Sequence, residues 1–85
     1  MPTVLISRGL ARKFTDGDIK LPLPKNADTI RAVIRELENL YPGLGDAVRG
    51  PSFAVAINGQ IYQDSLLEPV PEGSEVCFLP AIDGG

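Results

Sequence analysis

The sequence contains no histidine and no tryptophan, and its single cysteine is Cys77. Such a chain lacks the residues of a Ser/His/Asp triad, a Cys/His dyad, an internal disulfide or a His/Cys metal site. Cys77 also has no basic residue near it in the sequence, because Arg49 is the last one, so nothing there would lower its pKa and make it a nucleophile. We therefore expect neither catalytic residues nor metal ligands.

Long apolar runs are missing as well. Only residues 4–6 are continuously apolar before Arg8, which is too short for the core of a secretion signal or for a membrane span of about 18 residues. The 44% hydrophobic and 22% charged residues are typical of a soluble globular protein, and 85 residues correspond to one domain. We expect a cytoplasmic protein that does not associate with membranes.

The net charge of −3 is unevenly distributed. Residues 1–42 carry seven Lys/Arg and five Asp/Glu, whereas residues 43–85 carry one Arg and six acidic residues. The acidic excess of the second half favours a basic protein partner and argues against binding to nucleic acid. An ordinary solvated acidic surface explains the same pattern, and the sequence leaves both interpretations open.

Alternating apolar residues predict five strands, at residues 3–7, 19–23, 53–57, 61–62 and 75–79. The turn dipeptides Asp16-Gly17 and Asn58-Gly59 are expected to join the first two strands and the third and fourth strands as hairpins, the second through a type I′ turn. Pro22 has no N–H to donate, so its strand is expected to lie at an edge of the sheet or to present that position outward.

An amphipathic helix is expected from about Thr29 to Leu40, with Asp28 as its N-cap. Its apolar residues follow helical spacing: Ile30, Val33, Ile34, Leu37 and Tyr41. Pro42 and Gly43 end this helix, and residues 44–48 are expected to form a further short helical turn.

One helix and one sheet can bury their apolar faces only against each other, which predicts a two-layer α+β sandwich. The expected core consists of Val4, Ile6, Ile19, Leu21, Ile30, Val33, Ile34, Leu37, Val55, Ile57, Leu67, Val76 and Phe78.

The last expected strand leads to the carboxyl end of the chain. If Val76 and Phe78 face the helix, Leu79 lies on the uncovered face of the sheet, where it is a candidate anchor for a partner. Gly84-Gly85 has no Cβ atoms, so it can pass through a narrow channel of a partner enzyme and present an unhindered carboxylate. A flexible end without function explains the two glycines equally well.

Three segments together resemble the MoaD/ThiS family of ubiquitin-like sulfur carrier proteins: Tyr-Pro-Gly-Leu at 41–44, Ala-Ile-Asn-Gly at 56–59, and the whole stretch 72–85 with its terminal Gly-Gly. The length and the Leu79-Pro80-Ala81 segment are most similar to the small subunit of molybdopterin synthase. The resemblance implies a β-grasp (ubiquitin-like) fold, with a mixed sheet of four to five strands, one main helix packed across it, and the first and last strands central and parallel. It also implies a domain over residues 1–80 and a flexible tail over 81–85.

The resemblance further implies how such a chain works. In these carriers an E1-like enzyme uses ATP and Mg²⁺ to adenylate the C-terminal carboxylate, here that of Gly85. Sulfur from a persulfide donor then displaces AMP and leaves a thiocarboxylate. The carrier is therefore a co-substrate that binds no cofactor itself, and it gives its sulfur to an acceptor enzyme such as the large subunit of molybdopterin synthase.

Other residues receive roles by the same resemblance. Ile82, Asp83 and Gly84 would thread into the partner, where the charge of Asp83 needs a polar or basic group in the channel. Leu79 and Pro80 would dock on the partner.

Several alternatives fit the same residues. The chain would then be a sulfur carrier for cysteine, thiamine or another sulfur metabolite, a protein modifier conjugated to lysines through Gly85, or a non-covalent interaction module.

Overall fold

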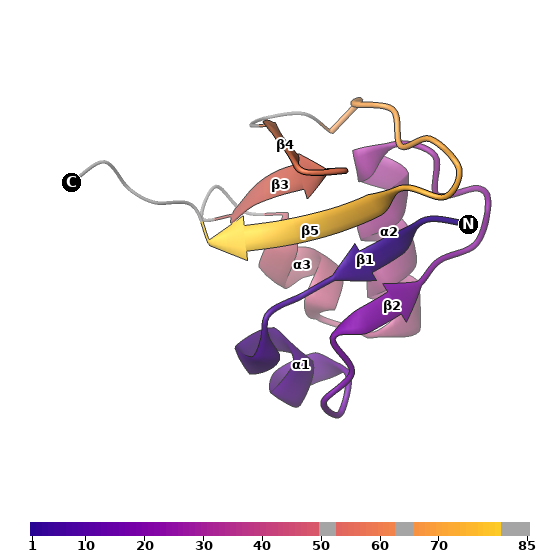
Figure 1. The fold of residues 1–85 in the computed structure, drawn as a ribbon. Helices are drawn as coiled ribbons and strands as arrows, with labels where there is room; N and C mark the ends of the chain where they lie inside the picture. Colours follow the sequence, from indigo (N-terminus) through magenta and orange to yellow (C-terminus); the bar gives the residue numbers. More distant parts are fainter. Residues whose placement is uncertain (50–52, 63–65, 81–85) are drawn as a thin grey trace.

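The computed structural model of this chain describes residues 1–49, 53–62 and 66–80. Along the chain lie β1 (Thr3–Leu5), α1 (Arg8–Phe14), β2 (Lys20–Pro22), α2 (Ile30–Leu40), α3 (Leu44–Val48), β3 (Phe53–Ile57), β4 (Gln60–Tyr62) and β5 (Glu75–Pro80). The strands form one five-stranded sheet in the order β2-β1-β5-β3-β4, and α2 packs across one of its faces (Figure 1).

The centre of the sheet joins strands from opposite ends of the chain. β1 pairs with β5 in parallel, with Leu5 opposite Cys77, and the remaining pairs of the sheet are antiparallel. This confirms the parallel pairing of the first and last strands. β2 lies at an edge, as the missing N–H of Pro22 predicts.

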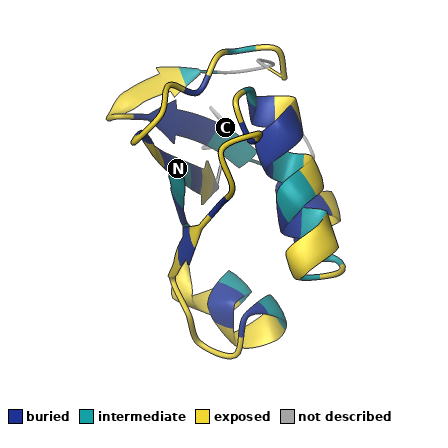
Figure 2. Ribbon diagram, turned by 90° about the vertical axis from the view of Figure 1, so that its right-hand side faces the viewer, coloured by how far each residue is buried: buried dark blue, intermediate teal, exposed yellow. Residues whose placement is uncertain are grey.

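The core lies between α2 and the sheet, where buried residues of both elements face each other (Figure 2). Val33 and Leu37 of α2 are completely buried, as are Val4 and Val76 of the two central strands. The expected helical stripe and most of the expected core are confirmed. Two members are wrong: Ile19 is 42% exposed and Leu67 is 77% exposed.

The exposure of Leu67 follows from hydrogen bonds at the start of α2. The backbone N–H groups of Ile30 and Arg31 donate to the carbonyl oxygens of Glu68 and Leu66, at 3.1 and 2.7 Å. These are amides of the first helical turn, which have no partner inside the helix. The loop at residues 66–70 therefore lies with its backbone against the helix, and its leucine side chains face outward.

The N-cap of α2 also differs from the prediction. Thr29 is the N-cap, and its hydroxyl oxygen accepts a hydrogen bond from the N–H of Ala32 at 3.1 Å. Asp28 precedes the cap, and its carbonyl oxygen accepts from the N–H of Val70 at 2.8 Å. The prediction was wrong by one residue because both side chains suit the position.

The sequence-based prediction missed α1. Ser7 caps this helix through a hydrogen bond from the N–H of Leu10 to its hydroxyl, at 3.2 Å, and Ala11 on its inner side is 1% exposed. β1 and β2 are therefore neighbours, as expected, but a helix and not a tight hairpin connects them.

Gly43 allows α1 to pack against the connection between α2 and α3. Its φ of +96° is a conformation that other residues rarely adopt, and a Cβ there would lie 2.8 Å from a ring carbon of Phe14. Phe14, in the last turn of α1, thus packs over a position between α2 and α3 that only glycine fits. The short helix 44–48 that follows is confirmed.

Glu38 fixes the connection between α2 and α3. Its carboxylate oxygens accept hydrogen bonds from the N–H groups of Gly43, at 2.8 Å, and Asp46, at 3.0 Å. These hydrogen bonds favour the ionised form, so the pKa of Glu38 lies below its ordinary value.

Replacing Glu38 by Gln is expected to lower the free energy of unfolding at neutral pH, because a neutral amide binds the two N–H groups less well. A lowered pKa stabilises the fold fully above the ordinary value of the carboxyl group, and this contribution is lost as the pH falls through the lowered pKa. Urea unfolding should therefore show a difference between the variant and the unsubstituted chain that is largest near neutral pH and shrinks as the pH falls below the ordinary pKa of the carboxyl group.

Glu36→Gln, on the same helix, is the control, since neither N–H group binds that side chain. A difference for Glu38→Gln that stays constant with pH would contradict the assignment.

Candidate functional site

The face of the sheet opposite α2 is open, and strand register determines which residues it presents. Side chains alternate along a strand, so residues paired across strands share a face. Leu5 is opposite Cys77, Cys77 is opposite Ala56, and Ala56 is opposite Ile61. A continuous apolar row therefore crosses β1, β5, β3 and β4 on the face without the main helix, which we call the open face.

Leu79 extends this row towards the end of β5. It pairs with Ala54 of β3 and is 37% exposed. Ile61, at the outer strand β4, is 62% exposed. The predicted exposure of Leu79 on the uncovered side is thus confirmed, and small residues between it and Ile61 leave the two larger side chains accessible to a flat partner surface.

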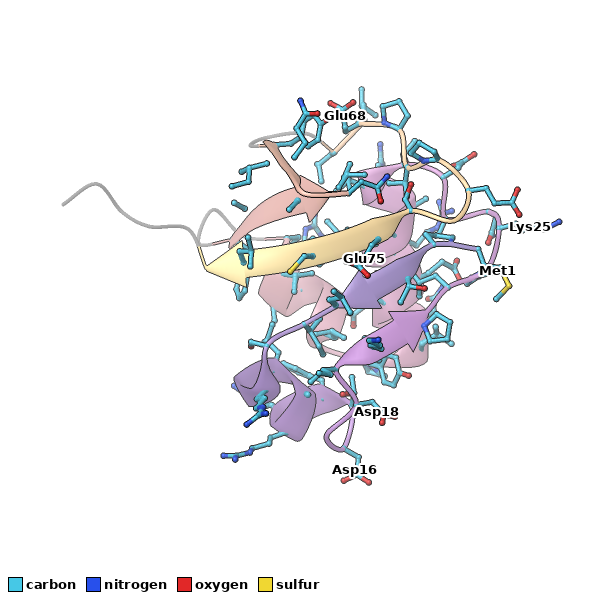
Figure 3. The ribbon with its side chains drawn as sticks, viewed as in Figure 1. Met1, Asp16, Asp18, Lys25, Glu68 and Glu75 are labelled. Atoms are coloured by element: carbon cyan, nitrogen blue, oxygen red, sulfur yellow. The ribbon has the colours of Figure 1, made fainter. Side chains whose placement is uncertain are left out.

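Charged residues border the open face. Lys20 of β2 lies opposite Leu5 in the register, and Glu75 at the start of β5 is opposite Thr3 and is drawn in front of the sheet in Figure 3. An apolar centre with a polar rim is the usual anatomy of a protein–protein contact.

The predicted reactive end follows directly from β5. This strand ends at Pro80. The tail at residues 81–85, with Ile82, Asp83, Gly84 and Gly85, lies outside the described residues. Their roles, and the docking roles of Leu79 and Pro80, remain predictions.

Ile61 is a candidate contact residue that the sequence-based prediction did not include. Its signal was nevertheless present, because a two-residue turn at Asn58-Gly59 requires Ile61 to lie opposite Ala56. Both turn residues have the positive φ values expected for this turn.

Asn58 has a structural role besides the turn. The side-chain oxygen of Asn58 accepts a hydrogen bond from the backbone N–H of Glu75 at 2.9 Å. The backbone N–H of Asn58 donates to the carbonyl oxygen of Glu75 at 2.9 Å. The hairpin is thereby fastened to the start of β5.

Cys77 lies half-buried in the middle of the open face. Burial raises the pKa of its thiol, and the negative charge of Glu75 raises this pKa further. The thiol is therefore largely protonated at neutral pH, which agrees with the expectation that it is not a nucleophile.

Within the described ranges, no helix is both long and apolar enough to cross a membrane. The same ranges contain no group of three His, Cys, Asp or Glu residues that is arranged to hold a metal ion.

The chain is similar to proteins of one family. Residues 9–85 match the ThiS family. The molybdopterin synthase sulfur carrier subunit of Pyrenophora tritici-repentis is 37% identical over 68 residues, which cover 76% of this chain and 69% of that protein.

Solved structures share the fold over nearly the whole length. A chain of the BexX/CysO complex of Amycolatopsis orientalis has a TM-score of 0.83 and 23% identity, with 100% of both chains covered. CysO of Mycobacterium tuberculosis has a TM-score of 0.81 and 26% identity, with 96% of this chain and 100% of that chain covered. SAMP1 of Haloferax volcanii has a TM-score of 0.75 and 22% identity, with 99% and 98% covered. The expected β-grasp fold is confirmed.

The raised pKa of Cys77 predicts slow alkylation. At about pH 8, iodoacetamide is expected to react more slowly with Cys77 than with the thiol of glutathione, because only the thiolate reacts. The rate for Cys77 should keep increasing as the pH is raised above the ordinary thiol pKa. Mass spectrometry of timed samples measures both rates.

Glu75→Gln is the matched variant, since it removes the neighbouring negative charge and should accelerate the reaction at the same pH. A rate for Cys77 that reaches its plateau below pH 8 would show a lowered pKa instead.

Proposed function

The chain belongs to the MoaD/ThiS family of ubiquitin-like sulfur carriers, and on this premise we propose that an E1-like enzyme adenylates the carboxylate of Gly85, which is then converted to a thiocarboxylate. The observation that carries the proposal is the family match over residues 9–85, which includes both terminal glycines.

The chemistry of the described residues supports a carrier that reacts through its main-chain end. The sole thiol, Cys77, has a raised pKa, and the described residues include no histidine that would activate it. A carboxylate is a poor electrophile until one of its oxygens is bonded to a leaving group such as AMP. In the proposed step the Gly85 carboxylate attacks the α-phosphorus of ATP, bound with Mg²⁺ by the partner enzyme, and pyrophosphate is released. The terminal sulfur of a persulfide donor then displaces AMP and forms an acyl disulfide. A thiol of the partner attacks the donor sulfur of this acyl disulfide, which releases the thiocarboxylate and leaves a disulfide between the thiol and the donor.

The acceptor is proposed to be the large subunit of a molybdopterin synthase. The name of the 37% identical relative favours this assignment. A carrier for a different acceptor, such as one that makes cysteine or thiamine, is the second candidate, because CysO of Mycobacterium tuberculosis is also similar over 96% of this chain.

The open face is proposed to dock on these partners, with Leu79 and Pro80 next to the tail. Burial of exposed apolar residues supplies most of the binding free energy in such contacts. Since β5 carries Leu79 and leads directly into residue 81, docking of this strand brings the reactive end to the partner.

Incubation with the adenylating enzyme, ATP and a sulfur source is expected to replace one oxygen atom of the chain by sulfur, as read by intact-mass analysis. Deletion of Gly85 should abolish the mass change, because the new terminal carboxylate, on Gly84, is one residue too short to reach the adenylation centre. Omission of ATP is the control. An unchanged mass shift after the deletion would overturn the proposal, and adducts with lysines of other proteins would indicate a modifier.

Leu79→Asp is expected to raise the KM for adenylation roughly tenfold or more with little change in kcat, because it places a charge in the apolar contact. Leu67→Asp is the matched control: it is also an exposed leucine, but it lies on the loop that is hydrogen-bonded to α2. Equal KM values for the two variants would exclude the open face as the docking surface.

A further inference from the structure

A hollow next to α1 has no role in the function proposed above. It has a volume of about 210 Å³ and is lined by Arg8, Arg12, Gly17 and Ile19. Arg8 and Arg12 are one helical turn apart, so their side chains lie on the same side of α1. Ile19 supplies an aliphatic surface between the helix and β2, which explains why a residue predicted for the core is 42% exposed.

Hydrogen bonds hold the two sides of the hollow together. The N–H of Gly17 donates to the carbonyl oxygen of Ala11 at 2.9 Å, and the N–H of Ile6 donates to that of Ile19 at 3.1 Å. The buried hydroxyl of Thr15 lies 2.5 Å from the carbonyl oxygen of Asp18 and 3.2 Å from that of Ala11. The turn is therefore fixed to the helix.

The arginines are available to an external group. In the part of the chain that the structure describes, the ion pairs join the Met1 amine to Glu72 and Arg49 to Asp46, so neither Arg8 nor Arg12 takes part in one. Two acidic residues, Asp16 and Asp18, flank Gly17 in the turn, and Figure 3 shows Asp16 projecting from the outer tip of the turn. Two guanidinium groups beside an aliphatic wall suit a carboxylate side chain, which can accept paired N–H bonds.

The position of the hollow relates it to the end of β5. β1 runs parallel to β5, with Leu5 opposite Cys77, and α1 begins three residues after Leu5. In Figure 1, α1 follows β1 and lies below β1 and β2, towards the end to which β1 and β5 both run. A protein that receives the chain beyond Pro80 approaches this same end.

We propose that the hollow binds Asp or Glu side chains at the rim of the enzyme that adenylates the chain, as a second contact besides the open face. The partner identity rests on the proposed function, whereas the preference for carboxylates rests on the geometry alone. Residues 1–42 have a net positive charge and residues 43–85 a net negative charge, and this asymmetry also orients the carrier as it approaches an acidic rim.

The first experiment compares two double variants in the adenylation assay. Arg8→Ala with Arg12→Ala should raise the KM roughly tenfold without changing kcat, and the difference should shrink at about 1 M salt, where charges are screened within about 3 Å. Arg31→Ala with Arg35→Ala is the matched control, because this exposed pair has the same spacing and charge but lies on α2. Equal KM values for both double variants would overturn the partner contact.

The second experiment separates failure of this inference from failure of the proposed function. Hexaglutamate is titrated into the ¹⁵N-labelled chain at low salt, and backbone NMR shifts are expected at Gly9, Gly17 and Ile19. These shifts should disappear in the Arg8/Arg12 variant and persist in the Arg31/Arg35 variant. Shifts that do not depend on Arg8 and Arg12 would refute the carboxylate site. If the unsubstituted chain takes up no sulfur, the proposed function and the partner assignment fail, and this titration still decides the chemistry of the hollow.

Discussion

The parallel pairing of β1 with β5 is the interaction on which the rest of the structure depends. It pairs Thr3 with Glu75 and Leu5 with Cys77. Val4 and Val76, which lie between these pairs, are completely buried on the side of α2. On one side it closes the core. On the other it produces the open face.

The two faces of the sheet differ in the size and burial of their side chains. The side towards α2 holds the large buried residues, whereas the open side has small residues at its centre and larger exposed ones at its border. Cys77 shows this division clearly, because its half-buried position next to Glu75 suppresses thiolate formation.

Local patterns were read correctly from the sequence where neighbouring residues decide the structure. The stripe of α2 and the Asn58-Gly59 turn depend on spacing and on positive φ, both of which a sequence displays. α1 was missed because it has only seven residues, includes Gly9, and follows a strand whose end at Leu5 carries no breaker.

The errors at Ile19 and Leu67 have a common cause in tertiary structure. Each residue continues a hydrophobic pattern, but a distant segment determines its exposure: α1 stands beside Ile19, and the first turn of α2 binds the loop of Leu67 through backbone carbonyls. No periodicity in the sequence reports such contacts. The candidate site was predictable only in part. The exposure of Leu79 follows from the alternation of side chains along a strand, whereas the hollow beside Arg8 and Arg12 depends on α1, which the sequence did not predict.

The order of the strands also bears on when the molecule becomes functional during its synthesis. β5 is the central strand of the sheet and the last to be made, so a growing chain lacks the neighbour that both β1 and β3 require. Contacts between such distant segments form slowly, because a long loop must close before they do. A chain that stops before β5 has neither the core nor the open face, so both form only when this strand is complete.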